Sequence, residues 1–131
     1  MATPANIKQS LAAYRAATAT FEPAPVEAAL AELMAENAGL HLCHPFGDVT
    51  GPDAFYATTL GPLHHAMPDL ERREMILIAG TTPEGQDWAA SMGSYMGTFS
   101  SAFLDIPPTG HLAHMRFHEY FKLEDGCVTE V

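Results

Sequence analysis

The spacing of apolar residues changes once along the chain, near Pro68, and this change limits the possible folds more than any other feature. Before it, apolar residues recur at helical intervals, as at Ile7 and Leu11. After it, apolar and polar residues alternate as they do in strands. Three long strands are predicted, over residues 72–79, 87–99 and 112–123. Helices followed by meandering strands indicate an α+β fold with an antiparallel sheet, rather than alternating βαβ units.

Three helices are expected before the strands. The first runs from Ile7 to near Thr20, and the second from Pro25 to a C-cap at Gly39. The short segment 40–46 is expected to be irregular. Gly51-Pro52 opens the third helix, with Asp48 and Thr50 as its expected caps. Gly61-Pro62 lies inside this helix and predicts a kink or a break.

Glycines and a tight turn shape the expected sheet. Gly93 and Gly97 interrupt the second long strand, and β-bulges are predicted at both, because glycine inside a strand often marks a bulge. Residues 124–126, with the sequence Glu-Asp-Gly, form the turn after the last long strand. Residues 127–131 then begin its hairpin partner.

Composition excludes several classes of function. The 131 residues suit one domain, and sixteen acidic against six basic residues give a formal charge of −10. Without a basic stripe, nucleic acid is not an expected partner. Cys43 and Cys127 lack a CxxC spacing and are expected as buried, reduced thiols of a cytoplasmic protein. No secretory signal opens the chain, and its most apolar run, 75–79, is too short to cross a bilayer.

Glu119 is the main candidate for chemistry. On the predicted last long strand it shares a face with apolar Met115, Phe117 and Phe121. A carboxylate on an apolar face is costly without a partner or a use, and burial raises the pKa of a carboxyl toward a useful range for proton transfer. Two other interpretations remain open: a structural carboxylate paired with an arginine, or an exposed strand edge. The opposite face carries His114, Arg116, His118, Tyr120 and Lys122, a polar surface or a subunit contact.

Other candidates have competing interpretations. His44, before Pro45, is either a second polar group at a cavity mouth or an ordinary loop histidine. Trp88, Tyr95 and Phe99 either line a ligand cavity or belong to the core. The seven histidines show no metal-ligand spacing, and no nucleotide, hydride or covalent-catalysis motif occurs. Metal-free and cofactor-free chemistry is therefore expected.

Several segments in this order resemble the SnoaL-like polyketide cyclase family of the nuclear-transport-factor-2-like fold. They are residues 44–48, 50–55, 68–73 and, most clearly, 88–126. The resemblance implies a cone-shaped, strongly curved antiparallel or mixed sheet covered by the N-terminal helices. It also implies one domain over residues 1–131 that stops within the last strand.

In this family an acid/base aspartate removes a proton next to a carbonyl, and an intramolecular aldol closure follows. By resemblance, Glu119 takes the place of a supporting histidine and His44 that of a polar residue at the mouth. The family's aspartate would fall just beyond Val131. The implied substrate-binding residues are Trp88, Tyr95, Phe99, Met115, Phe117 and Phe121.

Two functions follow as expectations. One is a cofactor-free lyase or isomerase acting on an apolar, neutral or weakly acidic carbonyl compound, with no metal and no nucleotide. The other is a small-molecule-binding or assembly module with the same cone. A homodimer is expected through the convex face, where His114, Arg116, His118 and Tyr120 would lie.

Overall fold

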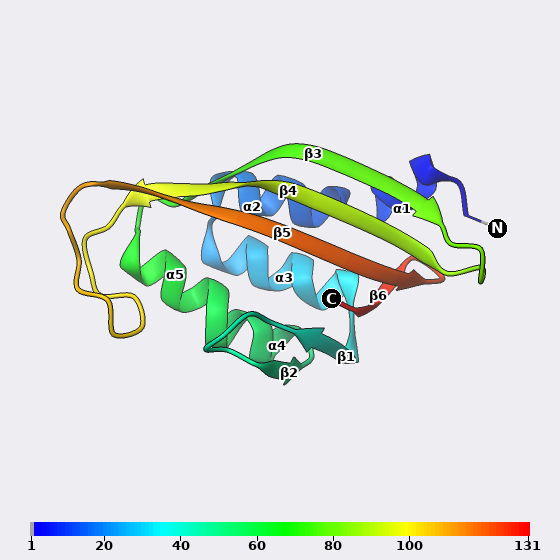
Figure 1. The fold of residues 1–131 in the computed structure, drawn as a ribbon, viewed down its shortest axis with the longest axis horizontal. Coiled ribbons are helices and arrows are strands. Elements are labelled where there is room, and N and C mark those ends of the chain that lie inside the picture. Colours follow the sequence, from blue (N-terminus) through cyan, green and yellow to red (C-terminus); the bar gives the residue numbers. More distant parts are fainter. Residues whose placement is uncertain (1) are drawn as a thin grey trace.

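A curved sheet lies over a layer of helices in the computed structural model, which describes residues 2–131 (Figure 1). Six strands form the sheet, in the order β2-β1-β6-β5-β4-β3. They are β1 (Met34–His41), β2 (Asp48–Thr50), β3 (Glu71–Thr81), β4 (Asp87–Thr98), β5 (Leu112–Glu124) and β6 (Cys127–Glu130). Neighbouring strands are antiparallel except β1 and β6, which run parallel. The predicted α+β class with a curved mixed sheet is confirmed.

The helices cover one face of this sheet. They are α1 (Pro4–Ser10), α2 (Ala12–Thr20), α3 (Pro23–Leu33), α4 (Pro52–Phe55), the π-helical turn η1 (Tyr56–Leu60) and α5 (Gly61–Ala66). The predicted first helix is interrupted at Leu11, whose backbone N–H bonds to Lys8 and so tightens the end of α1. Its apolar stripe is nevertheless continuous, because Ile7, Leu11 and Tyr14 are all buried against the sheet.

The second helix is shorter than predicted. It ends at Leu33, and residues 34–41 form strand β1 instead of continuing the helix to Gly39. Pairing decides this, since β1 bonds to β2 on one side and to β6 on the other. Ala38 and Leu40 are fully buried in this strand, so tertiary contacts override the local preference. Strands therefore occur before Pro68 as well as after it.

The expected caps of the third helix are also wrong. Asp48 and Thr50 pair in β2, and the N-cap of α4 is Gly51, with no side-chain capping bond. The expected irregularity near Gly61-Pro62 is present as the π-helical turn η1. Pro62 has no N–H to donate, so the regular bonding pattern cannot pass through this point.

The three long strands are in continuous register except at one place. The register of β3 on β4 shifts between Glu74 and Ile76, opposite Gly93. The irregularity predicted at Gly93 therefore belongs to the partner strand. The bulge predicted at Gly97 is wrong, because β4 and β5 pair without a shift there. A Cβ on Gly97 would lie 2.8 Å from the Met67 Cβ, and this close packing accounts for the glycine.

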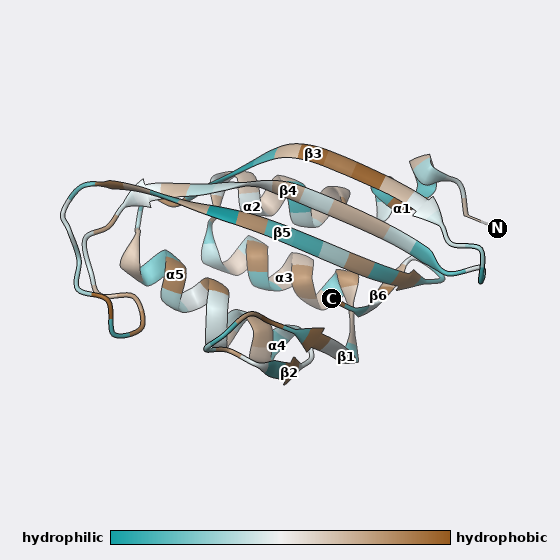
Figure 2. Ribbon diagram, in the orientation of Figure 1, coloured by the Kyte–Doolittle hydropathy of each residue, from teal (hydrophilic) through white to brown (hydrophobic). Residues whose placement is uncertain are grey.

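The two faces of β4 separate clearly. Ala89, Ser91, Tyr95 and Phe99 are buried on the concave face beneath the helices. Alternation places the even-numbered residues of β4 on the convex face, which the helices do not cover. Figure 2 shows a hydrophobic stretch along β3, which is the strand at one edge of the sheet. Among residues 2–131 no helix is long and apolar enough to span a membrane.

Candidate active site

A cavity of about 290 Å³ lies between β5, the loop after β1, and the helical run from α4 to α5. It opens along the part of β5 that β6 does not cover, since β6 pairs only with residues 122–124. Most of its wall is apolar. The apolar lining residues are Leu42, Phe46, Phe55, Leu60, Leu63, Phe103, Met115, Phe117 and Val131. Such a wall, with few polar groups, is typical of small-molecule sites.

Glu119 is the carboxylate of this cavity. Its side chain is 13% exposed, and both of its oxygens are engaged. The Tyr14 hydroxyl donates to Oε1 over 2.9 Å, and Arg72 Nη2 donates to Oε2 over 2.6 Å. The charge-assisted bond from Arg72 is the stronger type of contact. Glu119 is thus a fixed anion at the edge of an apolar space. The arginine partner considered as an alternative is present, together with the cavity.

A second carboxylate completes the buried network. Glu74 accepts bonds from Arg15 Nε over 2.7 Å and from Ser91 Oγ over 2.6 Å. Arg72 Nη1 lies 3.6 Å from Glu74 Oε2, so one guanidinium faces both carboxylates. The Arg72 side chain is 2% exposed. A buried arginine of this kind requires both partners, because an unpaired buried charge is costly.

The backbone at Gly93 makes room for this arrangement. The Arg72 Cζ lies 4.1 Å from the centre of the Phe117 ring and 5.2 Å from that of Tyr14. A Cβ on Gly93 would lie 2.8 Å from Phe117 Cζ and 2.0 Å from the Arg73 carbonyl oxygen. Only glycine therefore allows Phe117 to lie flat against the sheet and support the guanidinium from one side.

Two tyrosines, Tyr14 and Tyr95, lie beside the Arg72–Glu119 ion pair, and they differ in their hydrogen bonding. Burial, reinforced by the negative charge of Glu119, raises the pKa of Tyr14 well above its usual value. Burial and Glu119 likewise raise the pKa of Tyr95, while the positive charge of Arg72 and the nearness of the Tyr14 and Arg72 donors to the hydroxyl lower it. Both phenols are therefore neutral donors near pH 7. Tyr14 uses its proton on Glu119, whereas the buried Tyr95 hydroxyl has no hydrogen-bond partner within residues 2–131.

The predicted substrate-binding residues separate into two groups on the concave face. Tyr95, Met115 and Phe117 line the cavity beside Glu119. Phe99 and Phe121 are buried in the core and do not belong to its wall. Phe121 packs edge-on against Tyr14, with ring centres 5.9 Å apart. These two residues support the site from behind.

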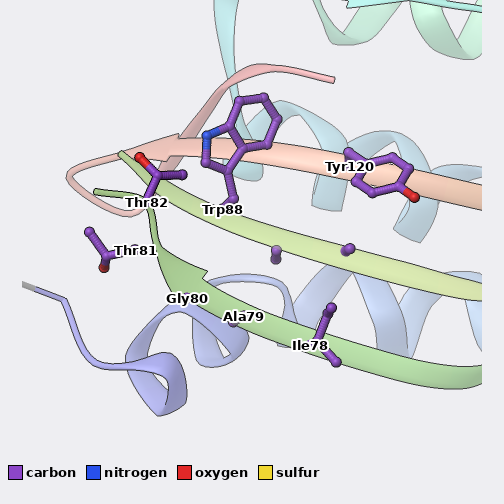
Figure 3. Close-up of a pocket in the computed structure, with 9 residues that line it drawn as sticks. Ile78, Ala79, Gly80, Thr81, Thr82, Trp88 and Tyr120 are labelled. Carbon is purple, nitrogen blue, oxygen red and sulfur yellow. The ribbon is translucent and has the colours of Figure 1, made fainter. Parts of the chain in front are cut away.

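Trp88 does not share this cavity, and its expected placement was wrong. It is an even-numbered residue of β4, whereas Tyr95 and Phe99 are odd-numbered, so alternation places it on the opposite face. There it lines a separate hollow of about 410 Å³ together with Ile78 and Tyr120. Figure 3 shows these three side chains on neighbouring strands around the hollow.

His44 is not among the residues lining the cavity, although Cys43 and Phe46 are. It is exposed in the turn after β1. Cys43 is exposed as well, which corrects the expectation of a buried thiol. Two histidines line the cavity: His41, at the end of β1, and His118 of β5.

Sequence reasoning did not identify His41. Its Nδ1 lies 3.1 Å from Asp48 Oδ1, and its Nε2 lies 3.4 Å from Glu130 Oε1. Recognising residues 34–41 as a strand would have pointed to it, because His41 then pairs directly with Asp48. In residues 2–131 no three histidine, cysteine or acidic side chains are grouped as metal ligands.

Comparisons with known proteins agree with this architecture. The model of a family described as SnoaL-like polyketide cyclase matches residues 10–131. No curated protein sequence is significantly similar to the chain.

Solved structures share the fold at low sequence identity. A proposed SnoaL-like polyketide cyclase from Jannaschia sp. CCS1 superposes with a TM-score of 0.78 at 20% identity, over 97% of this chain and 83% of the other. IdmH, a proposed polyketide cyclase from Streptomyces antibioticus, gives 0.74 at 21% identity, over 95% and 87%. AclR, a proposed hydroxylase from Streptomyces galilaeus, gives 0.76 at 18% identity, over 98% and 73%.

Proposed function

The chain belongs to the SnoaL-like polyketide cyclase family, and from this premise we propose that it is a cofactor-free lyase or isomerase acting on an apolar carbonyl compound. The reaction would be an aldol cyclisation or an isomerisation, which begins when a proton leaves the carbon next to the carbonyl. The observation that carries this proposal is the Glu119 carboxylate, fixed at the wall of an apolar cavity. Fold alone does not decide activity, so the proposal rests on this site.

Glu119 would act as the base. Each carboxylate oxygen has two lone pairs, so the bonds from Tyr14 and Arg72 leave further acceptor positions open. The two donors fix the orientation of the carboxylate, and the apolar wall excludes water from it. Tyr95, Met115 and Phe117 would hold the ligand beside it. His44 has no part in this proposal, because it is outside the cavity wall.

A direct test follows the exchange of α-protons. We propose to incubate the protein with the bicyclic ketone β-tetralone in D₂O and to follow loss of the α-proton signals by NMR. The wild-type protein is expected to accelerate exchange, and Glu119→Gln to lower that acceleration by about a hundredfold, within the range for removing a general base. Glu124→Gln is the matched control, since Glu124 is an exposed residue of the same strand. Wild-type exchange no faster than buffer, or unchanged exchange in Glu119→Gln, would contradict the proposal.

A second candidate function is a non-catalytic module that binds small molecules. It is favoured by one observation: both Glu119 oxygens are already bonded, and Arg72 neutralises the charge of the carboxylate. Such a carboxylate is a stable structural element. Binding of the ketone without exchange would favour this function over catalysis.

We also propose that two copies of the chain associate through the convex face of β3, β4 and β5. Ile78 is 60% exposed there and Tyr120 59%, on either side of the hollow that contains Trp88 (Figure 3). Exposed apolar side chains gathered on one sheet face are a feature of protein interfaces. We propose a second copy as the partner, because positive and negative side chains balance on this face although the chain as a whole is acidic.

That balance comes from paired residues. Arg73 lies 3.0 Å from Glu71, and Lys122 lies 3.8 Å from Glu130. Arg116, which forms no ion pair within residues 2–131, adds a positive charge to a chain whose formal charge is −10. Two copies can therefore meet here with less repulsion than at other faces. We also propose a cytoplasmic location, where Cys43 and Cys127, both free thiols, would stay reduced.

A further inference from the structure

Two buried polar atoms of the site have no hydrogen-bond partner within residues 2–131: the Tyr95 hydroxyl oxygen and Arg72 Nε. Tyr95 is 4% exposed, and its oxygen has no hydrogen-bond partner within residues 2–131. Leaving a buried hydroxyl unpaired costs free energy, and most buried polar groups in proteins are paired. An unpaired hydroxyl beside a candidate catalytic carboxylate therefore requires an explanation.

The surroundings of Tyr95 fix the ring and leave the hydroxyl unbonded. The ring packs against Phe117, with centres 5.1 Å apart, and edge-on against Phe21, with centres 6.3 Å apart. Arg72 is its direct cross-strand neighbour on β3, and Met115 its neighbour on β5. Arg72 directs its Nη2 to Glu119 and Ser91 instead. The hydroxyl thus lies near the Tyr14 hydroxyl and the Arg72 guanidinium, which lower its pKa, but it forms no hydrogen bond of regular geometry with either.

We propose that the Tyr95 hydroxyl binds the carbonyl oxygen of the ligand, while Glu119 faces the adjacent carbon. This assignment rests on the proposed function and adds to it the group that receives the developing negative charge. Tyr95 and Glu119 line the same cavity. A ligand oxygen would reach the hydroxyl past Met115, a flexible side chain that is 36% exposed.

The proposed step balances without a cofactor. Glu119 takes the proton, the C–H electron pair forms a carbon–carbon double bond, and the carbonyl π electrons move onto oxygen. Tyr95 keeps its proton and donates it as a hydrogen bond to that oxygen, away from bulk water. Donors placed where negative charge develops are among the largest contributions to such reactions. Return of the proton from Glu119 to a different carbon completes an isomerisation. In D₂O, the proton on Glu119 is replaced by a deuteron from the solvent, and delivery of that deuteron to the α-carbon completes an exchange.

Tyr95→Phe tests this proposal, since it removes the hydroxyl and keeps the ring packing. Exchange of β-tetralone α-protons is expected to fall about a hundredfold, as for loss of one oxyanion donor. The melting temperature is expected to stay equal or rise, because no protein hydrogen bond is lost. Tyr14→Phe provides the contrast: it removes a bond to Glu119 and is expected to lower the melting temperature. Tyr56→Phe, on the π-helical turn and outside the cavity wall, is the control for exchange.

Binding gives a readout that does not depend on catalysis. In protein labelled with ¹³C at the tyrosine Cζ, β-tetralone is expected to shift the Tyr95 signal, and Tyr95→Phe to weaken binding about tenfold. If the wild-type protein binds in this way without catalysing exchange, the proposed function fails and the Tyr95 assignment stands. If Tyr95→Phe exchanges and binds as the wild type does, or if it lowers the melting temperature as much as Tyr14→Phe, the assignment is overturned.

Discussion

At the scale of single residues, Glu119 depends on partners that come from distant parts of the sequence. Tyr14 reaches it from α2, and Arg72 from β3. Alternation along β5 was enough to place Glu119 on the apolar face. It could not identify the two donors, because helix-to-sheet contacts and the buried direction of Arg72 are set by tertiary packing. His41 was missed for a related reason, since its strand resembles a helix locally.

Replacing Arg72 tests how far the network depends on one guanidinium. Arg72→Met is expected to destabilise the protein by about 3–5 kcal/mol, because two buried carboxylates lose their shared partner. Arg73→Met is the control: Arg73 is exposed and pairs only with exposed Glu71, so its loss is expected to cost less than about 1 kcal/mol. Urea unfolding measures both. Equal stability of the two variants would contradict the role of Arg72.

The tyrosines of the network predict how stability changes with pH. Burial, then the charge of Glu119, raises the pKa of Tyr14 in the folded state. Below the ordinary tyrosine pKa near 10, the phenol is neutral in both states and its contribution is complete. Above that pH the unfolded chain loses the proton first, so folding stability falls as pH rises. Tyr14→Phe has no phenol at this position, so its stability lacks this contribution to the pH dependence.

The gap in unfolding free energy between wild type and Tyr14→Phe is therefore expected to narrow as pH rises above about 10. Urea unfolding at pH values on either side of this point measures it. A gap that stays constant or widens would show that Tyr14 does not titrate as a buried phenol.

At the scale of elements, the register shift between the paired strands β3 and β4 at Gly93 shapes the concave face. The register of β3 shifts opposite this residue, and Phe117 of β5 lies against it. A glycine inside a predicted strand indicated an irregularity, and one is present. The strand that carries it could not be predicted, because a bulge depends on the pairing of two strands rather than on either sequence.

Gly93→Ala is expected to destabilise the protein by about 3 kcal/mol or more, since its Cβ would meet a backbone oxygen at 2.0 Å. Gly80→Ala is the matched control in β3. Nothing lies within 4 Å of the added Cβ there, so the change is expected to stay within about 0.5 kcal/mol. Thermal unfolding compares the two. Similar melting temperatures would contradict the prediction, because they would show that the strands move apart at Gly93 at little cost in stability.

At the scale of the whole molecule, the two faces of the sheet differ in the residues and cavities that they carry. The helices cover the concave face of the sheet (Figure 1). This face holds the cavity and the buried network, and the convex face carries exposed apolar side chains over β3 to β5. The change in periodicity near Pro68 predicted the α+β class. It did not reveal β1 and β2, whose pairing completes the sheet.

Association through the convex face can be measured by sedimentation velocity. The wild-type chain is expected to sediment as a dimer at micromolar concentration. Ile78→Lys is expected to give a monomer with an unchanged circular dichroism spectrum, because Ile78 is exposed in the single chain and its charge would enter an apolar contact. Glu84→Lys, in the turn between β3 and β4, introduces a lysine outside this face and is the control. A wild-type monomer would rule out the dimer.

The central claim is that ligands bind in the concave cavity with an oxygen near Glu119 and Tyr95. A crystal structure with bound β-naphthol tests it most directly, because this phenol has the planar bicycle and the sp² carbon–oxygen bond of a ketone's enol. The predicted result is β-naphthol in the cavity lined by Phe117, with its oxygen within hydrogen-bond distance of the Glu119 carboxylate or the Tyr95 hydroxyl. β-Naphthol bound instead in the convex hollow beside Trp88, with the concave cavity closed by protein side chains, would contradict the claim.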